Sequence, residues 1–342
     1  MGRPVGAPVI VLRPYRGPQD HPAMSAAANA IDVFNGAPTV RSVADMDNYY
    51  GHLQGVDLPR DCTLVEVDGV VRAYGRVAHD DLMSGEFQVF LIVNVDPTIH
   101  DLAVEDRLLQ RMLERADEVL AIVPADRTVL VKVGAKERHP GLGAAAEALG
   151  FRHSRSGAQL IRPSVDDVPE LTLPDGLVIR PIAADDRVMH RRIYDAGKRA
   201  FAETYGEEAA SDAEFERFIG APTFDPTLWQ VAFDGDEIAG QILNFMDEQR
   251  TDTDWIGWTE GISVQPEYRR RGLARALLAA SIRRVAAAGA TRTALGVDLQ
   301  NPNEAATLYQ SMGYQIVALD REYTIGPFPA GSRPRLVQET RA

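Results

Sequence analysis

The segment Val264–Ala274 reads VQPEYRRRGLA and joins an apolar run to a helix-like segment, RALLAASIRRVAAAGA. Pro266 cannot continue a strand, and Gly272 carries no side chain at the point where the helix is expected to begin. The first backbone N–H groups of a helix have no partner within it, and together with the helix dipole they bind phosphate oxygens well. Three arginines, Arg269 to Arg271, stand beside these groups. The stretch therefore predicts a strand–turn–helix unit that binds a pyrophosphate.

The net charge argues against a nucleic-acid contact for these arginines. The chain of 342 residues has 36 Lys and Arg against 49 Asp and Glu, a formal net charge of -13. Nucleic acids and anionic membranes are bound by basic surfaces, so neither is expected as a partner. A solvated surface run remains an alternative, because short glycine-containing motifs often arise by chance. An amine-bearing or basic partner suits the acidic chain better.

Length and composition predict a two-domain globular protein. A domain usually has about 100 to 200 residues, and the hydrophobic content of 45% is sufficient for two cores. Cys62 is the single cysteine, so neither an intrachain disulfide nor a thiolate zinc cluster is expected, and the histidines show no metal-ligand spacing. The sequence has no long apolar run of membrane-helix length and no signal-peptide pattern. We therefore expect a cytoplasmic protein without a metal.

The sequence contains one internal repeat. VIVLRPYR at Val9–Arg16 matches GLVIRPIA at Gly176–Ala183. Each copy continues with a hairpin pattern around Asp-Gly, a strand that ends before a proline, and a long amphipathic segment. Each copy then has a short helix that stops at a C-cap glycine, Gly150 in the first and Gly313 in the second.

These matches predict two domains of the same fold. Their bounds are expected at 8–163 and 177–328, and the Pro- and Asp-rich segment 164–176 between them is expected to be a linker because it has no periodicity. From the middle of each copy onward strands and helices alternate, which is typical of an α/β sheet with helices on both faces.

Two motifs in the second copy resemble the GNAT acyltransferase superfamily. The turn carries the pattern Arg/Gln, two residues, Gly, one residue, Gly/Ala, and the segment NPNEAATLYQSMGY at 301–314 carries the family's second signature. The resemblance extends from Leu177 to Thr324. It implies two tandem GNAT folds, each a mixed, mostly antiparallel twisted sheet with helices on both faces, and acetyl-CoA as the acyl donor. The cofactor contacts that it implies are Ile262, Val264, Arg269, Arg270, Arg271, Gly272, Leu273, Ala274 and Asn301.

Two residues are expected to move protons. Attack of an amine on a thioester needs a deprotonated amine and a proton for the departing thiolate. The resemblance implies that Tyr309 donates that proton, with a half-buried aromatic that only packs the last helix as the alternative. Glu260 is the candidate base, because burial on an apolar strand face shared with Ile262 and Val264 would raise its pKa. A structural glutamate that accepts a hydrogen bond from Trp258, with ordered water as the base, remains open.

Acidic residues are the candidates for binding the acceptor. Glu203 follows the first strand of the second copy, and Asp247 ends its hairpin. Both could attract a cationic acceptor, and both could equally be solvated surface charges.

The first copy lacks the residues of both motifs. The aligned residues are His100 for Arg269, Ala103 for Gly272, Glu105 for Ala274 and Ala146 for Tyr309. A carboxylate near the helix start opposes phosphate binding. The first domain is therefore expected to be a degenerate GNAT fold that does not bind CoA.

The expected function is acetyl-CoA-dependent N-acetyl transfer to a primary amine of a small molecule, by direct attack in the second domain. Two alternatives stay open: an acceptor amine on a protein or peptide, and a non-catalytic sensor that binds acyl-CoA. The chain is expected to act as a monomer or a homodimer.

Overall fold

The structure divides into two compact units. This computed structural model describes residues 7–38, 40–82, 84–205, 211–251, 254–300, 305–332 and 335–336. The first unit consists of the described residues of Met1–Asp47, Leu53–Ser156 and Leu319–Ala342, and the second of those of Asn48–His52 and Gly157–Ala318. Each unit is therefore assembled from segments that are distant in sequence.

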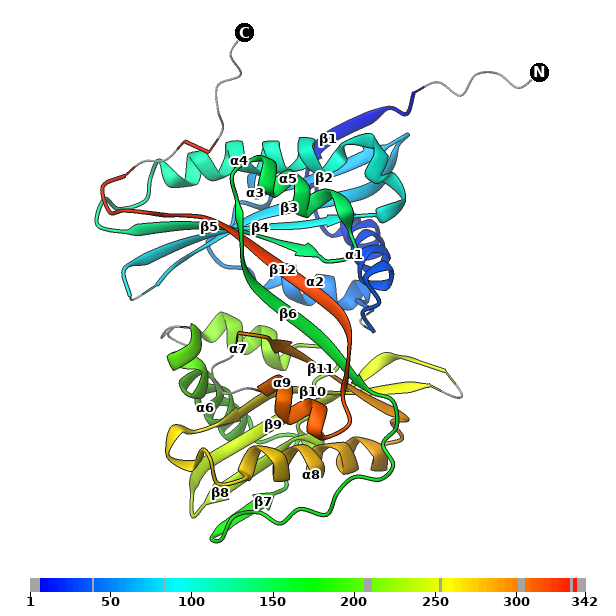
Figure 1. The fold of residues 1–342 in the computed structure, drawn as a ribbon, viewed down its shortest axis with the longest axis vertical. Coiled ribbons are helices and arrows are strands. Elements are labelled where there is room, and N and C mark those ends of the chain that lie inside the picture. The colour runs from blue at the N-terminus through cyan, green and yellow to red at the C-terminus, as the bar shows by residue number, and fades with distance from the viewer. Residues whose placement is uncertain are drawn as a thin grey trace, which may run out of the picture. The chain divides into compact units, whose positions relative to one another are not determined.

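The first repeat alternates strands and helices (Figure 1). Its elements are β1 (Ile10–Pro14), α1 (His21–Asn35), α2 (Val43–Gly51), α3 (Leu58–Asp61), β2 (Cys62–Val67), β3 (Val70–Asp81), β4 (Glu86–Val95), α4 (Val104–Leu120), β5 (Thr128–Lys136), α5 (Pro140–Ala148) and β6 (Arg152–Arg162). The short 3-10 helices η1 (Pro18–Asp20) and η2 (Pro97–Leu102) precede α1 and α4. The strands β1 to β5 pair in chain order, and only the β4–β5 pair is parallel.

The second repeat has the same order of elements. They are β7 (Leu177–Arg180), α6 (Arg187–Tyr205), α7 (Asp212–Ile219), η3 (Pro226–Leu228), β8 (Gln230–Asp234), β9 (Glu237–Arg250), β10 (Trp255–Val264), η4 (Pro266–Tyr268), α8 (Leu273–Ala287), β11 (Arg292–Asp298), α9 (Ala305–Ser311) and β12 (Gln315–Phe328). The strands β7 to β11 again pair in chain order, with β10–β11 as the parallel pair. Both C-cap glycines, Gly150 and Gly313, have a positive φ. The repeat and the mixed, mostly antiparallel fold predicted from the sequence are confirmed.

The last strand of each repeat completes the sheet of the other unit. In the first unit β12 pairs antiparallel with β5, and in the second unit β6 pairs antiparallel with β11. The domains expected at 8–163 and 177–328 follow the chain consecutively, whereas the compact units exchange these strands. Residues 163–176, between β6 and β7, contain neither helix nor strand.

Close packing fixes α8 against the sheet of the second unit. The helix buries one side, including Leu273, Leu277 and Ile282, and such burial contributes about 25 cal/mol per Å² of apolar surface. Gly257 of β10 lies so close to the helix that an added Cβ would be 2.6 Å from the Cβ of Val285. Figure 1 shows α6 and α8 on opposite faces of this sheet. The start of α8 is thereby held at the end of β10.

The parallel strands β10 and β11 separate before they end. They pair only from Ile256 to Trp258 of β10, after which β10 continues to Val264 along β9 alone. A register shift between Glu260 and Ser263 marks a β-bulge, in which Gly261 has a φ of 58°. The edge of β10 beyond Trp258 consequently has no partner strand among the described residues.

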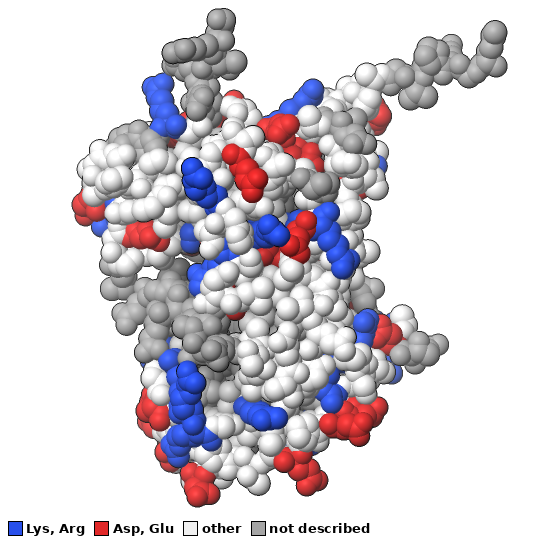
Figure 2. All heavy atoms as spheres, in the orientation of Figure 1, with Lys and Arg blue, Asp and Glu red and all other residues white. Residues whose placement is uncertain are grey.

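The face of the molecule in Figure 2 carries side chains of both charges. On the face in Figure 2 neither the basic nor the acidic side chains cover a continuous area. Of the helices in the described ranges, none combines the length and the apolar character needed to cross a membrane.

Candidate active site

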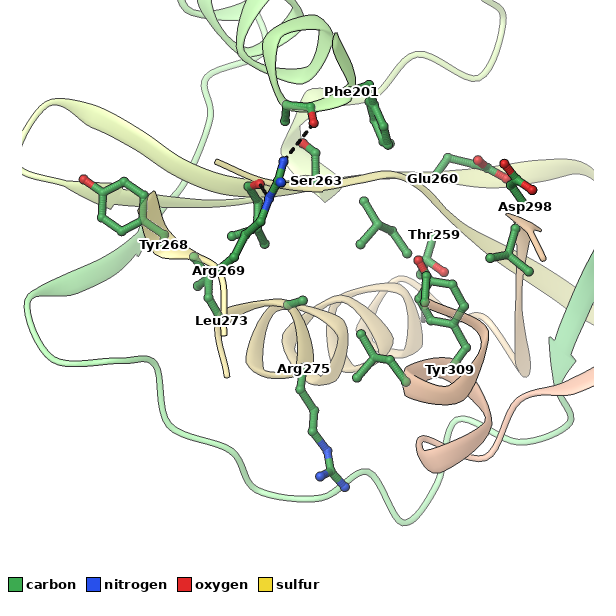
Figure 3. A pocket seen from close by; sticks show the side chains of 18 of the residues that line it. Phe201, Thr259, Glu260, Ser263, Tyr268, Arg269, Leu273, Arg275, Asp298 and Tyr309 are labelled. Atoms are coloured by element: carbon green, nitrogen blue, oxygen red, sulfur yellow. Dashed lines mark hydrogen bonds between the residues drawn. The ribbon is translucent and has the colours of Figure 1, made fainter. Parts of the chain in front are cut away.

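A cavity of about 780 Å³ lies in the second unit, where β10 and β11 separate (Figure 3). It is bounded by the last turns of α6, the free edge of β10, the start of α8, the end of β11 and α9. The residues that line it are Lys198, Ala200, Phe201, Thr259, Glu260, Gly261, Ile262, Ser263, Val264, Tyr268, Arg269, Arg270, Gly272, Leu273, Ala274, Arg275, Gly296, Val297, Asp298, Ala305, Leu308 and Tyr309. Most of the residues predicted from the two motifs therefore lie around one cavity.

The turn before α8 presents backbone N–H groups to this cavity. Gly272 is the N-cap of α8, in the left-handed conformation with a φ of 85°, and no side chain caps the helix. No acceptor among the described residues is bonded to the N–H groups of Leu273, Ala274 or Arg275, whereas Ala276 donates to the carbonyl of Gly272. A Cβ added at Gly272 would meet no atom within 4 Å. The start of α8 therefore has free donors beside open space, as an anion site needs.

The three arginines of the turn have different surroundings. Arg269 is half-buried, and its guanidinium donates to the carbonyl oxygens of Val264 and Ala200, each at 3.1 Å. Arg270 is exposed, lines the cavity and has a left-handed φ of 61°. Arg271 is exposed outside the cavity lining, with its guanidinium 5.7 Å from the centre of the Tyr268 ring. Of the three, only Arg270 presents an exposed cation to the cavity.

The candidate base lies at the point where the two strands have parted. Burial raises the pKa of Glu260 to about 7, while a hydrogen bond from the backbone N–H of Gly296 acts in the opposite direction. The bulge after Glu260 interrupts the two-residue alternation from which a face shared with Ile262 and Val264 was predicted. All three residues nevertheless line the cavity, because the free edge of β10 borders it on both sides of the bulge.

The candidate acid, Tyr309, is buried and contacts the cavity from α9. In Figure 3 its ring extends from α9 toward Thr259 of β10. Behind it the ring of Tyr314 lies 6.2 Å away, edge to face. The hydroxyl of Tyr314 accepts a hydrogen bond from Thr293 at 2.8 Å and lies 3.3 Å from that of Thr259. Buried hydroxyl groups thus bridge β10 and β11 next to Tyr309.

Besides Arg271, the predicted residue Asp247 does not line the cavity, and two further predicted residues cannot be placed from the described part of the chain. Asp247 is buried elsewhere, where its carboxylate accepts a hydrogen bond from the Trp258 indole at 3.3 Å. This is the role that the sequence left open for Glu260. Asn301 lies outside the described residues, and Glu203 lies in α6 with its side chain outside them.

The two sequence motifs did not single out several other residues at this site. Lys198 and Phe201 of α6, Thr259 of β10 and Asp298 of β11 all line the cavity. Figure 3 shows the carboxylates of Glu260 and Asp298 at the end of the cavity away from Tyr268. Within the described ranges, no group of three or more His, Cys, Asp or Glu side chains is arranged to hold a metal ion.

The equivalent turn of the first unit shares the left-handed N-cap but has different side chains. Ala103 is the N-cap of α4 in the left-handed conformation, with a φ of 51°, which confirms its alignment with Gly272. The side chain of Glu105 is buried, and its carboxylate lies 3.4 Å from His139, the N-cap of α5. Burial lowers the pKa of His139. A carboxylate of the chain itself therefore lies near the start of α4.

Comparisons with known proteins agree with this architecture. The family model described as the acetyltransferase (GNAT) family matches residues 191–314. A mycothiol acetyltransferase of Gordonia bronchialis is 30% identical over 233 residues, which cover 67% of this chain and 73% of that protein. One from Kocuria rhizophila is 30% identical over 190 residues, which cover 54% of this chain and 58% of that protein. The chain thus spans less than two thirds of the first relatives that it matches.

Solved structures match nearly the whole chain. A GCN5-related N-acetyltransferase from Sphaerobacter thermophilus has a TM-score of 0.69 at 23% identity, with 94% of this chain and 96% of that chain covered. A tandem GNAT protein from the clavulanic acid biosynthesis pathway has a TM-score of 0.67 at 16% identity, with 94% and 99% covered. At these identities the likeness shows the fold, which is a tandem GNAT fold. The family model, the relative from Gordonia and this fold together show that the chain belongs to the GNAT family of acetyltransferases.

Proposed function

We propose that the second unit transfers the acetyl group of acetyl-CoA to a primary amine of a small molecule by direct attack. One observation carries the proposal: a single cavity is bordered by the free N–H groups of α8, the free edge of β10, Glu260 and Tyr309. An anion site, a strip of unpaired backbone, a base and an acid are the parts that this reaction needs.

The cavity can hold the donor in one orientation. The diphosphate would accept hydrogen bonds from the start of α8, where Gly272 leaves the backbone uncovered. The amide-bearing arm of the donor would pair with the edge of β10 beyond Trp258, since peptide-like groups can replace the missing neighbour strand. The thioester would then lie farther along the strand, toward Glu260 and Tyr309.

Glu260 has a pKa suited to a general base. With a pKa of about 7, its carboxylate is largely ionised above neutrality and still basic enough to accept a proton. It would take the proton of the incoming ammonium, so that the amine lone pair can attack the acetyl carbon. The acetyl group is not covalently bonded to the enzyme at any point in this scheme.

Tyr309 would complete the proton balance. As the tetrahedral intermediate collapses, the C–S bond breaks and the sulfur leaves as a thiolate. The phenol on α9 would donate its proton to that sulfur. The resulting phenolate would be reprotonated, directly or through water, by the second proton that the nitrogen loses as the amide forms, and the proton held by Glu260 would pass to solvent. Burial beside Tyr314 keeps the ring in place, which favours transfer over a short distance.

The second unit alone is proposed to be active. In the first unit Ala146 stands where Tyr309 stands in the second. The buried carboxylate of Glu105 near the start of α4 would repel a diphosphate there. The first repeat therefore supplies structure, including the strand β6, whose residues 157–162 pair with β11 in the second unit.

Release of free CoA thiol in the presence of an amine panel tests the proposal. The name shared by the relatives makes mycothiol without its acetyl group the first acceptor to try, followed by glucosamine, spermidine and a peptide with a free N-terminus. We expect turnover with at least one small amine and a rate for the peptide at least tenfold lower. Preference for the peptide would move the acceptor to proteins. Tight acetyl-CoA binding without turnover of any amine would favour a sensor.

A further inference from the structure

Two side chains of the turn between β10 and α8 donate hydrogen bonds to backbone carbonyl groups of α6. Gln265 is buried, and its Nε2 donates to the carbonyl oxygen of Ala196 at 2.8 Å. Arg269, four residues later, donates from Nη2 to the carbonyl oxygen of Ala200 at 3.1 Å. Ala196 and Ala200 are also four residues apart and lie one above the other on the same face of α6. The turn and the helix are thus joined by two matched hydrogen bonds.

This face of α6 is built for close contact with the sheet. Ala196 and Ala200 are buried, and Gly197 lies between them. A Cβ added at Gly197 would be 2.8 Å from Nε2 of the buried Gln241 of β9. Small residues let the helix backbone approach the strands, so that glutamine and arginine side chains can reach its carbonyl groups. The position of α6 against the sheet is therefore fixed by specific hydrogen bonds as well as by apolar packing.

The guanidinium of Arg269 connects the turn before α8 to the end of β10 and to α6. Its Nε donates to the carbonyl oxygen of Val264 at the end of β10, while its Nη2 bonds to α6. In Figure 3 it points toward the Phe201 end of α6 and away from α8. The planar guanidinium donates to these two carbonyl oxygens. It is therefore not directed at the first N–H groups of α8, where a diphosphate would be bound.

We infer that Arg269 is a positioning residue that seats α6 at the acceptor side of the cavity, and not a ligand of the diphosphate. The bonds of Gln265 to Ala196 and of Arg269 to Val264 and Ala200 form what we call the α6 clasp. Because α6 carries Lys198, Ala200 and Phe201 into the cavity, the clasp sets the wall that an acceptor contacts. This inference rests on the proposed function of the site.

The clasp also explains why the first arginine of the turn differs from the other two. Arg270 and Arg271 are exposed, so their charges can attract the diphosphate from solvent. Arg269 instead places its charge near the C-terminal part of α6, where helix carbonyl groups favour a cation. The same three-residue run therefore serves two purposes, donor attraction and seating of α6.

Two variants with two acyl donors test the inference. S-acetylpantetheine shares the thioester and the arm of acetyl-CoA and lacks the diphosphate and the nucleotide. For Arg269→Gln we expect the Kd of acetyl-CoA to stay within about threefold of wild type, because no diphosphate contact is lost. With the best amine of the panel, we expect the acceptor KM to rise about tenfold or more, as when a charge-assisted hydrogen bond is removed. Amide hydrogen exchange at residues 191–201 should become faster, with or without acetyl-CoA.

Arg270→Gln is the matched control for charge. It removes the same charge from the neighbouring residue, and we expect it to weaken acetyl-CoA about tenfold while leaving S-acetylpantetheine and exchange in α6 unchanged. Arg269→Lys keeps the charge but cannot make both bonds, so it should resemble Arg269→Gln in acceptor KM.

A selective loss of acetyl-CoA affinity in Arg269→Gln, with S-acetylpantetheine unaffected and Arg269→Lys close to wild type, would overturn the inference and make Arg269 a diphosphate ligand. General misfolding would instead weaken both donors together and lower the melting temperature, and this result would also count against a positioning role. If wild-type protein binds no acetyl-CoA, the proposed function fails. Exchange in α6 would then still decide whether the clasp exists.

Discussion

The carboxyl group of Glu260 faces the backbone of Gly296 across the gap between the separated strands β10 and β11. A Cβ built on Gly296 would lie 3.9 Å from Oε1 of Glu260, and the Gly296 N–H donates to this carboxyl group. Burial exceeds the effect of this hydrogen bond and raises the pKa of Glu260 to about 7. The separation of the two strands therefore creates both the cavity and the environment that tunes its candidate base.

The pH dependence of activity should report this pKa. Since the ionised carboxylate is the base, kcat/KM for the amine should fall below about pH 7, and Glu260→Gln should lose this limb together with about 100-fold in rate. Steady-state rates from pH 5.5 to 9 with one amine check the prediction. An identical acidic limb in both proteins would assign it to the substrate amine and would argue for water as the base.

Protein stability should depend on the same group. The pKa of Glu260 is higher in the folded protein than its ordinary value of 4.5, so the folded state ionises this group less readily than the unfolded state. Its contribution to stability is fully present below about pH 4.5 and is lost as the pH rises through about 7. Glu260→Gln should therefore raise the melting temperature at pH 8 more than at pH 5. Equal shifts at both values would contradict the raised pKa.

Loss of the Tyr309 hydroxyl should slow the reaction without weakening donor binding. Tyr309→Phe keeps the buried ring, and we expect kcat to drop about 100-fold with the Kd of acetyl-CoA unchanged. Tyr323→Phe, which alters a buried tyrosine of the first unit, is the matched control and should retain its rate. If Tyr309→Phe were as fast as wild type, the ring would have a packing role only.

Charge at the start of α8 should control donor binding. Gly272→Glu places a carboxylate beside the free N–H groups, and we expect acetyl-CoA affinity to fall about 100-fold through like-charge repulsion. Gly272→Ala is the control that separates backbone strain from charge. An alanine in this left-handed conformation costs about 1 kcal/mol, so the affinity for acetyl-CoA should fall less than tenfold.

Ala103→Glu makes the corresponding change in the first unit, where the N-cap already has a non-glycine residue in the left-handed conformation. Calorimetry should find one acetyl-CoA per chain in wild type and in Ala103→Glu. A second site in wild type that is lost in Ala103→Glu would refute the proposal that only one unit binds the donor.

Much of the site was predictable because it depends on local chemistry. Pro266, Gly272 and the apolar spacing of α8 determine a strand, a turn and a helix start wherever they occur in a fold. The location of Tyr309 at the cavity followed from the second motif. By contrast, the sequence suggested either an acceptor contact or a solvated charge for Asp247 and did not indicate its burial against Trp258, because that contact depends on the pairing of β9 with β10.

The sequence by itself determined the repeat, the two α/β folds and the turn before α8, since each depends on periodicity and on backbone preferences within a few residues. Only the tertiary structure decided which sheet each last strand joins, because β5 and β11 occupy equivalent places in the two repeats and local sequence pattern does not determine which strand pairs with each. It also decided that Arg269 faces α6, since the carbonyl oxygen of Ala200 that accepts its hydrogen bond is 69 residues away in sequence. Long-range contacts of this kind arise only when the chain has folded.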